Sequence, residues 1–97
     1  ISDAMLAAYQ QIIQSEFKTV KVSAEYEFRE EYGVFINAIG IPSDKRANFS
    51  RFILDTLAPS LEELGFEFIG IIPYSMEEAE TKYPGVWAEM QREGGSW

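Results

Sequence analysis

The same order of residue types ends two apolar runs in this chain of 97 residues. "VFINAIGI" ends at Pro42 and leads to Ser43, and "FEFIGII" ends at Pro73 and leads to Ser75. Proline ends a strand because it has no N–H to donate to the ladder, and serine is a favoured N-cap of helices. Ser75 and Glu78 also have the spacing of a capping box. The chain is therefore predicted to make two strand-to-helix turns, and this repeat is the strongest constraint on its fold.

A strictly alternating stretch precedes these runs. Over residues 20–29 the apolar and polar residues follow one another in the order Val20, Lys21, Val22, Ser23, Ala24, Glu25, Tyr26, Glu27, Phe28 and Arg29. A period of two over ten residues predicts a long strand with one apolar face and one solvent-exposed polar face. Gly33 can adopt the positive φ of a hairpin turn, so it leads into a second strand over 34–41.

Two registers of this hairpin are open. A loop of even length pairs Phe28 with Phe35 and directs Asn37 toward the core, whereas a three-residue loop pairs Phe28 with Ile36 and directs Asn37 outward. Burial of an amide without a partner costs about 1–3 kcal/mol. We therefore favour the three-residue loop, with Gly33 as a bulge.

Apolar residues at helical spacing predict three helices. The first begins after Ser2 and buries a stripe formed by Met5, Leu6, Tyr9, Ile12, Ile13 and Phe17. The second begins after Ser43 and carries a stripe formed by Ala47, Phe49, Phe52, Ile53, Leu57, Leu61 and Leu64. Pro59 should kink or restart the second helix, and Gly65 should end it. The third runs from Ser75 to about Tyr83, where Pro84 ends it or begins a further turn.

The predicted element order is α-β-β-α-β-α. This order indicates an α+β fold (αββαβα) of two layers, in which a three-stranded mixed sheet packs against helices. A helical crossover joins the second and third strands, so these two should run parallel, beside an antiparallel hairpin of the first two. The strands lie in the order 1-2-3, or the first lies between the other two. Because the second and third strands are apolar on both faces, we expect them in covered positions, and the first at an edge or with one face open.

The chain is predicted to form one domain over residues 1–97. Its 46% of hydrophobic residues are enough for a core without disulfides. Residues 94–97 are predicted to be a flexible tail. Since the chain starts at Ile1, either it is processed, or residues 1–4 are an added remnant and Met5 is the native start.

The chain has no Cys and no His. This excludes thiol nucleophiles, Ser-His-Asp triads, thiolate and imidazole metal sites, and the usual proton shuttle near neutral pH. We predict no catalytic residue, no metal and no cofactor. Sixteen acidic and eight basic residues give a net charge of −8, which argues against nucleic acid and anionic membranes as partners. The lack of Cys, of a secretory pattern and of a long apolar run fits a cytoplasmic protein.

One candidate ligand site follows from the two turns, because ligands of open sheets bind beyond the carboxyl ends of the strands, near helix N-termini. The residues predicted at this edge are Ser43, Lys45, Arg46, Tyr74 and Ser75. Lys45 and Arg46 oppose the helix dipole, which a binding role would explain, whereas Asp44, Glu77 and Glu78 would repel an anion. The alternative is ordinary helix caps with solvated charges.

Candidate interaction residues come from the hairpin and the last segment. Glu25 and Glu27 belong to an acidic hairpin surface, for which a solvated face is the alternative. Val34 and Ile36 remain on an open apolar face if helices cover only one side of the sheet, and such a face favours a symmetric dimer. Trp87 is a candidate anchor for a partner. For these three apolar residues the alternative is packing in the core of the same chain.

No motif indicates a family or a reaction. The favoured hypothesis is a non-enzymatic, acidic interaction or regulatory protein that self-associates through its sheet and masks a basic protein partner. The alternative is a small enzyme or ligand-binding domain with an anionic small-molecule site at the shared edge.

Overall fold

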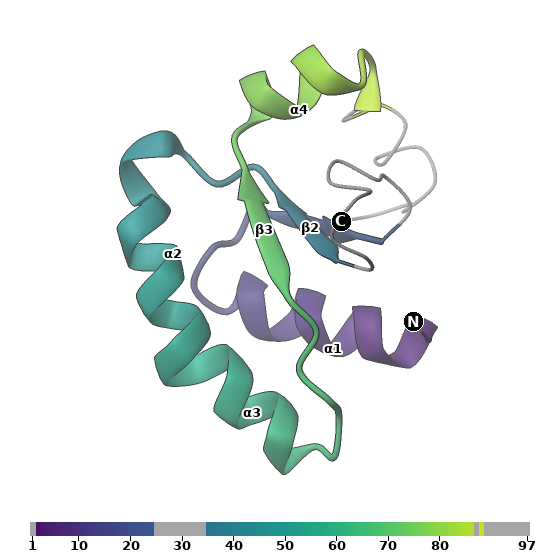
Figure 1. Ribbon diagram of the computed structural model, residues 1–97, viewed down its shortest axis with the longest axis vertical. Helices are drawn as coiled ribbons and strands as arrows, with labels where there is room; N and C mark the ends of the chain where they lie inside the picture. Colours follow the sequence, from purple (N-terminus) through teal and green to yellow (C-terminus); the bar gives the residue numbers. More distant parts are fainter. Residues whose placement is uncertain (1, 25–34, 87, 89–97) are drawn as a thin grey trace.

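Three short strands form one mixed sheet in the order β1-β2-β3. They are β1 (Lys21–Ser23), β2 (Ile36–Ile39) and β3 (Ile71–Tyr74), in a computed structural model that describes residues 2–24, 35–86 and 88. β1 is antiparallel to β2, and β2 is parallel to β3 (Figure 1). The predicted α+β fold with a mixed sheet is therefore confirmed. Of the two predicted strand orders, the sheet has 1-2-3, with β1 at an edge.

Helices precede and follow the sheet strands as predicted. α1 (Asp3–Gln14) precedes β1, and α4 (Met76–Lys82) follows β3. One long helical stretch connects β2 with β3; in chain order it consists of η2 (a 3-10 turn, Ser43–Lys45), α2 (Arg46–Phe52), η3 (a π-helical segment, Ile53–Leu57) and α3 (Ala58–Glu63). Figure 1 shows α1, α2 and α3 beside the sheet and α4 beyond the tip of β3.

The main core lies between the sheet and the helices α1, α2, η3 and α3. Its buried residues are Tyr9, Ile13, Val20, Val22, Ile36, Ala38, Ile41, Phe49, Phe52, Leu57 and Leu61. The predicted apolar stripes of the first two helices supply most of them. Phe17, in the turn after α1, places its ring edge-on to Phe49 at 5.3 Å and to Phe52 at 5.5 Å between centroids. These aromatic contacts pack the turn after α1 against α2.

A second, smaller core covers the opposite face of the sheet. It consists of Ile39, Tyr74, Ala79 and Val86, so α4 and the turn after it pack on this face. Ser23 pairs with Asn37. This register differs from both predicted ones, in which Asn37 would pair with Glu27 (three-residue loop) or with Tyr26 (even loop). Asn37 lies between Ile36 and Ala38 of the main core, so its side chain is on the opposite face, the side that the favoured loop assigned to it. Asn37 is nevertheless only 2% exposed. The expectation that it faces solvent is wrong, because this face carries packed side chains. The predicted pairing of Phe28 lies outside the described residues.

The polar residues of β1 are buried as well. Lys21 is 5% exposed and Ser23 is 7% exposed. The predicted solvent-exposed face of the first strand is therefore wrong at these two positions, since the face that they share with Asn37 is closed. Burial lowers the pKa of Lys21 below its ordinary value, because the charged form is desolvated. The rest of the alternating stretch, including Glu25 and Glu27, lies outside the described residues.

Pro59 interrupts the long helical stretch, as predicted. It has no N–H to donate to the carbonyl of Asp55 four residues earlier. The N–H of Ala58 donates to the carbonyl of Ile53, five residues earlier, so the turn before Pro59 is wider than an α-helical turn. Gly65, with a φ of 82°, then ends α3.

Candidate functional site

The two strand-to-helix turns lie side by side at one edge of the sheet. The carbonyl oxygen of Tyr74 accepts hydrogen bonds from the N–H groups of Gly40 and Ile41, at 2.8 and 3.0 Å. Arg46, in the first turn of α2, forms an ion pair with Glu78 of α4. The prediction that both helices start at the same edge is confirmed.

Glu78 also completes the predicted capping box of α4. The N–H of Ser75 donates to Oε1 of Glu78 at 2.9 Å, and the N–H of Glu78 donates to Oγ of Ser75 at 3.1 Å. Arg46 opposes the dipole of α2, but its charge is compensated by this carboxylate. The position of Arg46 therefore has an explanation that needs no ligand.

The five residues of the predicted ligand edge do not share one cavity. Ser43 and Ser75 line a hollow of about 290 Å³ between the two turns. Lys45 lines a larger pocket of about 560 Å³ on the other side of α2. Arg46 is paired with Glu78, and Tyr74 is buried in the second core.

The smaller hollow has no basic residue in its lining. Glu77 lines it beside the two serine residues, and Gly40, Pro42 and Met76 complete it. A carboxylate at this position repels an anion, and α2 and α4 are each only seven residues long. The hollow therefore gives little support to an anion site between the helix starts.

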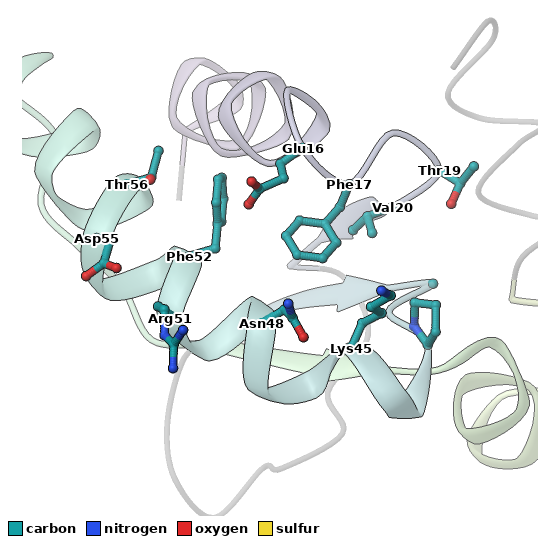
Figure 2. A pocket seen from close by; sticks show the side chains of 12 residues that line it. Glu16, Phe17, Thr19, Val20, Lys45, Asn48, Arg51, Phe52, Asp55 and Thr56 are labelled. Carbon is teal, nitrogen blue, oxygen red and sulfur yellow. The ribbon is translucent and has the colours of Figure 1, made fainter.

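The larger pocket lies between α2 and the segment that joins α1 to β1. Phe17 and Val20 come from this segment, and Phe52 comes from the facing side of α2. Figure 2 shows Phe17 in the middle of the pocket, with Glu16 on the α1 side of it and Lys45 and Asn48 on the α2 side. The pocket thus has an apolar floor and two polar walls. Its volume lies in the range of small-molecule sites, which is about 300–1,000 Å³.

Four charged residues line this pocket, two of each sign. Lys45 and Arg51 are basic, whereas Glu16 and Asp55 are acidic. Neither Lys45 nor Arg51 forms an ion pair with a residue in the described part of the chain. Asn48 adds an amide between the two basic residues. Exposed charges that are not paired with each other are available to a ligand.

The sequence prediction found Lys45 and missed the rest of this pocket. Lys45, Asn48, Phe52 and Asp55 are spaced by three or four residues, so they lie on one side of the helical stretch. This spacing was a usable signal for one wall. The other wall comes from a segment about thirty residues earlier, and no local pattern indicates that it lies opposite.

The free edges of the sheet are poor templates for another strand. Gln10 of α1 accepts a hydrogen bond from the N–H of Val22 at 2.8 Å and donates one to the carbonyl of Val20 at 2.7 Å. Its amide thus occupies the outer edge of β1. In β3, the alternation of a parallel ladder turns the backbone groups of Ile71 and Pro73 outward, and Pro73 has no N–H to offer.

The predicted interaction residues fall in different places. Ile36 is fully buried in the main core, so core packing, the alternative named above, describes this position. Glu25, Glu27, Val34 and Trp87 lie outside the described residues. The described part of the sheet therefore leaves no open apolar face at Ile36.

Exposed apolar side chains occur instead on the helical stretch and on the connection from α3 to β3. Leu54 is 75% exposed, Leu64 is 60% exposed and Phe68 is 41% exposed. Leu64 and Phe68 alternate with three exposed acidic residues, Glu62, Glu63 and Glu67. We call these five residues the 62–68 surface. The sequence patterns placed Leu64 in the core stripe of the second helix and Phe68 in the third strand, whereas β3 begins only at Ile71, so this surface was not predicted.

The 62–68 surface belongs to a long acidic segment of the chain. From residue 52 to residue 81 the chain has no Lys or Arg, whereas it has seven acidic residues: Asp55, Glu62, Glu63, Glu67, Glu77, Glu78 and Glu80. The side chain of Phe68 is held in place, because its ring stacks on that of Tyr9 with 6.4 Å between centroids. The surface thus combines a fixed aromatic residue with acidic neighbours.

Two kinds of site are absent from the part of the chain that the structure describes. No three acidic residues there come together as a group that could hold a metal ion. Within residues 2–24 and 35–86, no helix combines the length and the apolar character that crossing a membrane requires. Comparison with protein-family models, with curated protein sequences and with solved structures finds no match for this chain.

Proposed function

We propose that this protein is a non-enzymatic interaction domain that binds and masks a basic protein partner through the 62–68 surface. The observation that carries the proposal is the exposure of Leu64 and Phe68 among Glu62, Glu63 and Glu67. Apolar side chains that become buried supply most of the affinity of an interface, while charges around them orient the partner and speed its approach.

The local structure supports this role because it holds the surface in place. After α3, the N–H of Gly65 donates to the carbonyl of Glu62 at 3.0 Å, and the N–H of Phe66 donates to that of Leu61 at 2.9 Å. A surface that is already ordered loses little conformational entropy when a partner binds.

The partner's own chemistry follows from complementarity. An apolar side chain flanked by Lys or Arg would contact Leu64 or Phe68 and place its charges next to the glutamates. The net charge of −8 would accelerate the encounter with a basic protein at low ionic strength. A neutralising role, such as that of an inhibitor, is the concrete form of this proposal.

A defined peptide pair tests the proposal. The first peptide is an amphipathic helix of Leu and Lys, and the second has the same Leu pattern with Glu in place of Lys. We expect the Lys peptide to bind, and the Leu64→Ala variant to bind it about fivefold more weakly, as expected for an apolar contact worth about 1 kcal/mol. Leu54→Ala is the matched control, since Leu54 is an exposed leucine outside the 62–68 surface.

Charge variants give the second readout. Replacement of Glu62, Glu63 and Glu67 by Gln should lower the affinity and flatten its dependence on salt between about 50 and 300 mM, because these charges are screened over that range. Equal binding of both peptides, or equal losses for Leu54→Ala and Leu64→Ala, would contradict the proposal.

Self-association and a cytoplasmic location remain predictions within this proposal. Light scattering of the purified chain tests the first, and fractionation of the producing cell tests the second. A dimer whose mass is unchanged in the Leu64→Ala variant would place the self-association elsewhere than on the 62–68 surface.

A further inference from the structure

The 560 Å³ pocket differs in charge from the rest of the protein. The whole chain has a net charge of −8, whereas Lys45, Arg51, Glu16 and Asp55 give the pocket lining a formal charge of zero. Two of the eight basic residues of the chain line this one cavity. The pocket is therefore not simply part of the acidic surface.

The floor of the pocket is apolar and held in place. Phe17 contacts Phe52 edge-on, with 5.5 Å between ring centroids and an angle of 76° between the rings. Phe52 and Val20 are buried and belong to the main core. A flat apolar group resting on Phe17 and Phe52 would find a preformed surface, which is the usual property of small-molecule sites.

The two polar walls decide the charge of the ligand. Lys45 is the last residue of η2, and Arg51 lies six residues later in α2, which is roughly 9 Å along a helix axis, with Asn48 midway between them. Asp55, four residues after Arg51, belongs to the same wall. An anionic group therefore fits best at the other end of this wall, where Figure 2 shows Lys45 and Asn48 together. Glu16 lies across Phe17 from this wall, as Figure 2 shows.

A ligand with only one sign of charge meets repulsion in this pocket. A simple anion is attracted by Lys45 and Arg51 but repelled by Glu16 and Asp55, and a simple cation meets the reverse. A molecule whose anionic group lies by Lys45 and whose cationic group lies toward Glu16 is attracted at both ends. Charge balance therefore selects a zwitterion over either ion.

We propose that this pocket binds a small aromatic zwitterion. Its carboxylate lies against Lys45 and Asn48, its ring lies on Phe17 and Phe52, and its ammonium group lies toward Glu16. The site is separate from the 62–68 surface, so the proposal does not depend on the proposed function.

Three related probes test it by titration of the ¹⁵N-labelled protein. 4-(Aminomethyl)benzoate carries both charges, benzoate carries the anion alone and benzylamine carries the cation alone. We expect 4-(aminomethyl)benzoate to bind at least about fivefold more tightly than each of the others, which is the effect of one further charge pair. The amide signals that shift should be those of residues 16–20 and 45–56.

Two variants and a control locate the binding. Lys45→Ala and Glu16→Gln should each reduce the affinity for 4-(aminomethyl)benzoate by about fivefold. The affinity for benzoate should fall in Lys45→Ala, whereas in Glu16→Gln it should stay unchanged or increase. Lys82→Ala, which removes an exposed basic residue at the end of α4, should have no effect. The proposal is overturned if benzoate binds as tightly as the zwitterion, if no probe binds, or if all three variants behave alike.

Discussion

Tyr9 and Ile69, sixty residues apart, are joined by two hydrogen bonds. The hydroxyl of Tyr9 donates to the carbonyl of Ile69 at 3.0 Å and accepts from its N–H at 2.6 Å. The side chain of Tyr9 is fully buried in the main core. One phenol thus satisfies both backbone groups of the residue next to Phe68, and it ties α1 to the approach to β3.

Tyr9→Phe should therefore destabilise the protein by about 1–3 kcal/mol, because a partly buried N–H and a carbonyl lose their partner while the ring stays in place. Urea denaturation followed by circular dichroism measures the change. Gln10→Ala on the same helix, which removes edge bonds of β1 but no contact with Ile69, separates this effect from general damage to α1. A loss below about 0.5 kcal/mol for Tyr9→Phe would mean that other groups, or water, replace the phenol.

The same residue should make stability fall at alkaline pH. Desolvation raises the pKa of Tyr9 above its ordinary value of 10.0, and this outweighs the hydrogen bond from the backbone of Ile69, which lowers it. Above pH 10 the unfolded chain loses this proton more readily than the folded protein does, so the free energy of unfolding falls as the pH rises. Tyr9→Phe should remove this part of the alkaline loss in denaturation curves measured between about pH 8 and 11.

Lys21 should act with the opposite sign. Burial lowers its pKa below 10.5, so between the two values the unfolded chain binds more protons than the folded protein. Its burial therefore costs stability at neutral pH, and this cost shrinks as the pH rises toward 10.5. Lys21→Met keeps an unbranched side chain but has no charge to desolvate. The free energy of unfolding of this variant, minus that of the unmodified protein, should therefore be more favourable near pH 7 than at a pH above 10.5. A pH-independent effect of Lys21→Met would contradict the assignment.

The contact between the two helix starts should contribute less than the cap beside it. Arg46 and Glu78 are both partly exposed, so their coupling in a double-mutant cycle with Arg46→Met and Glu78→Gln should be about 0–1 kcal/mol. Gln at position 78 can still accept from the N–H of Ser75, which keeps the capping box.

Ser75→Ala should cost about 0.5–2 kcal/mol, since it leaves the N–H of Glu78 without its acceptor. A larger effect of Glu78→Gln than of Ser75→Ala in urea denaturation would reverse this ranking.

Gly65 offers a test of backbone conformation alone. Its φ is 82°, and a Cβ at this position would meet no atom within 4 Å. Gly65→Ala should therefore destabilise by about 1 kcal/mol through strain without any clash, and Gly65→Asn should cost less, because Asn tolerates the left-handed region better. Thermal denaturation compares the two variants, and equal effects would contradict the conformational explanation.

Much of this fold was accessible from local patterns. Pro42 and Ser75 predicted where strands give way to helices, because each acts on its own backbone neighbourhood. Two details were wrong: Ser43 is the first residue of η2 and does not cap it, and Pro73 lies within β3 and does not end it. The break at Pro59 and the end at Gly65 followed in the same way. The parallel direction of β2 and β3 followed from the helical crossover between them, which requires only the order of elements.

The misses come from packing between distant segments. Lys21, Ser23 and Asn37 alternate with apolar residues as surface residues should, yet all three are buried. Polar patterning does not reveal whether a sheet face is covered. The 560 Å³ pocket escaped for the same reason. Its α2 wall has a helical spacing, but Glu16 and Phe17 come to face it only after the chain has folded.

The amide of Gln10 has a consequence for how copies of this molecule meet. It stands where the backbone of an incoming strand would have to bond to Val20 and Val22. The amide of Gln14 also donates to the carbonyl of Val20, at 3.1 Å, so two side chains of α1 cover this edge of the sheet. A rotamer change at Gln10, or a mutation to a residue without an amide, would expose the N–H of Val22 to a second chain while the carbonyl of Val20 stays bonded to Gln14, so protection against fibre formation at this edge is weaker for one backbone group than for the other.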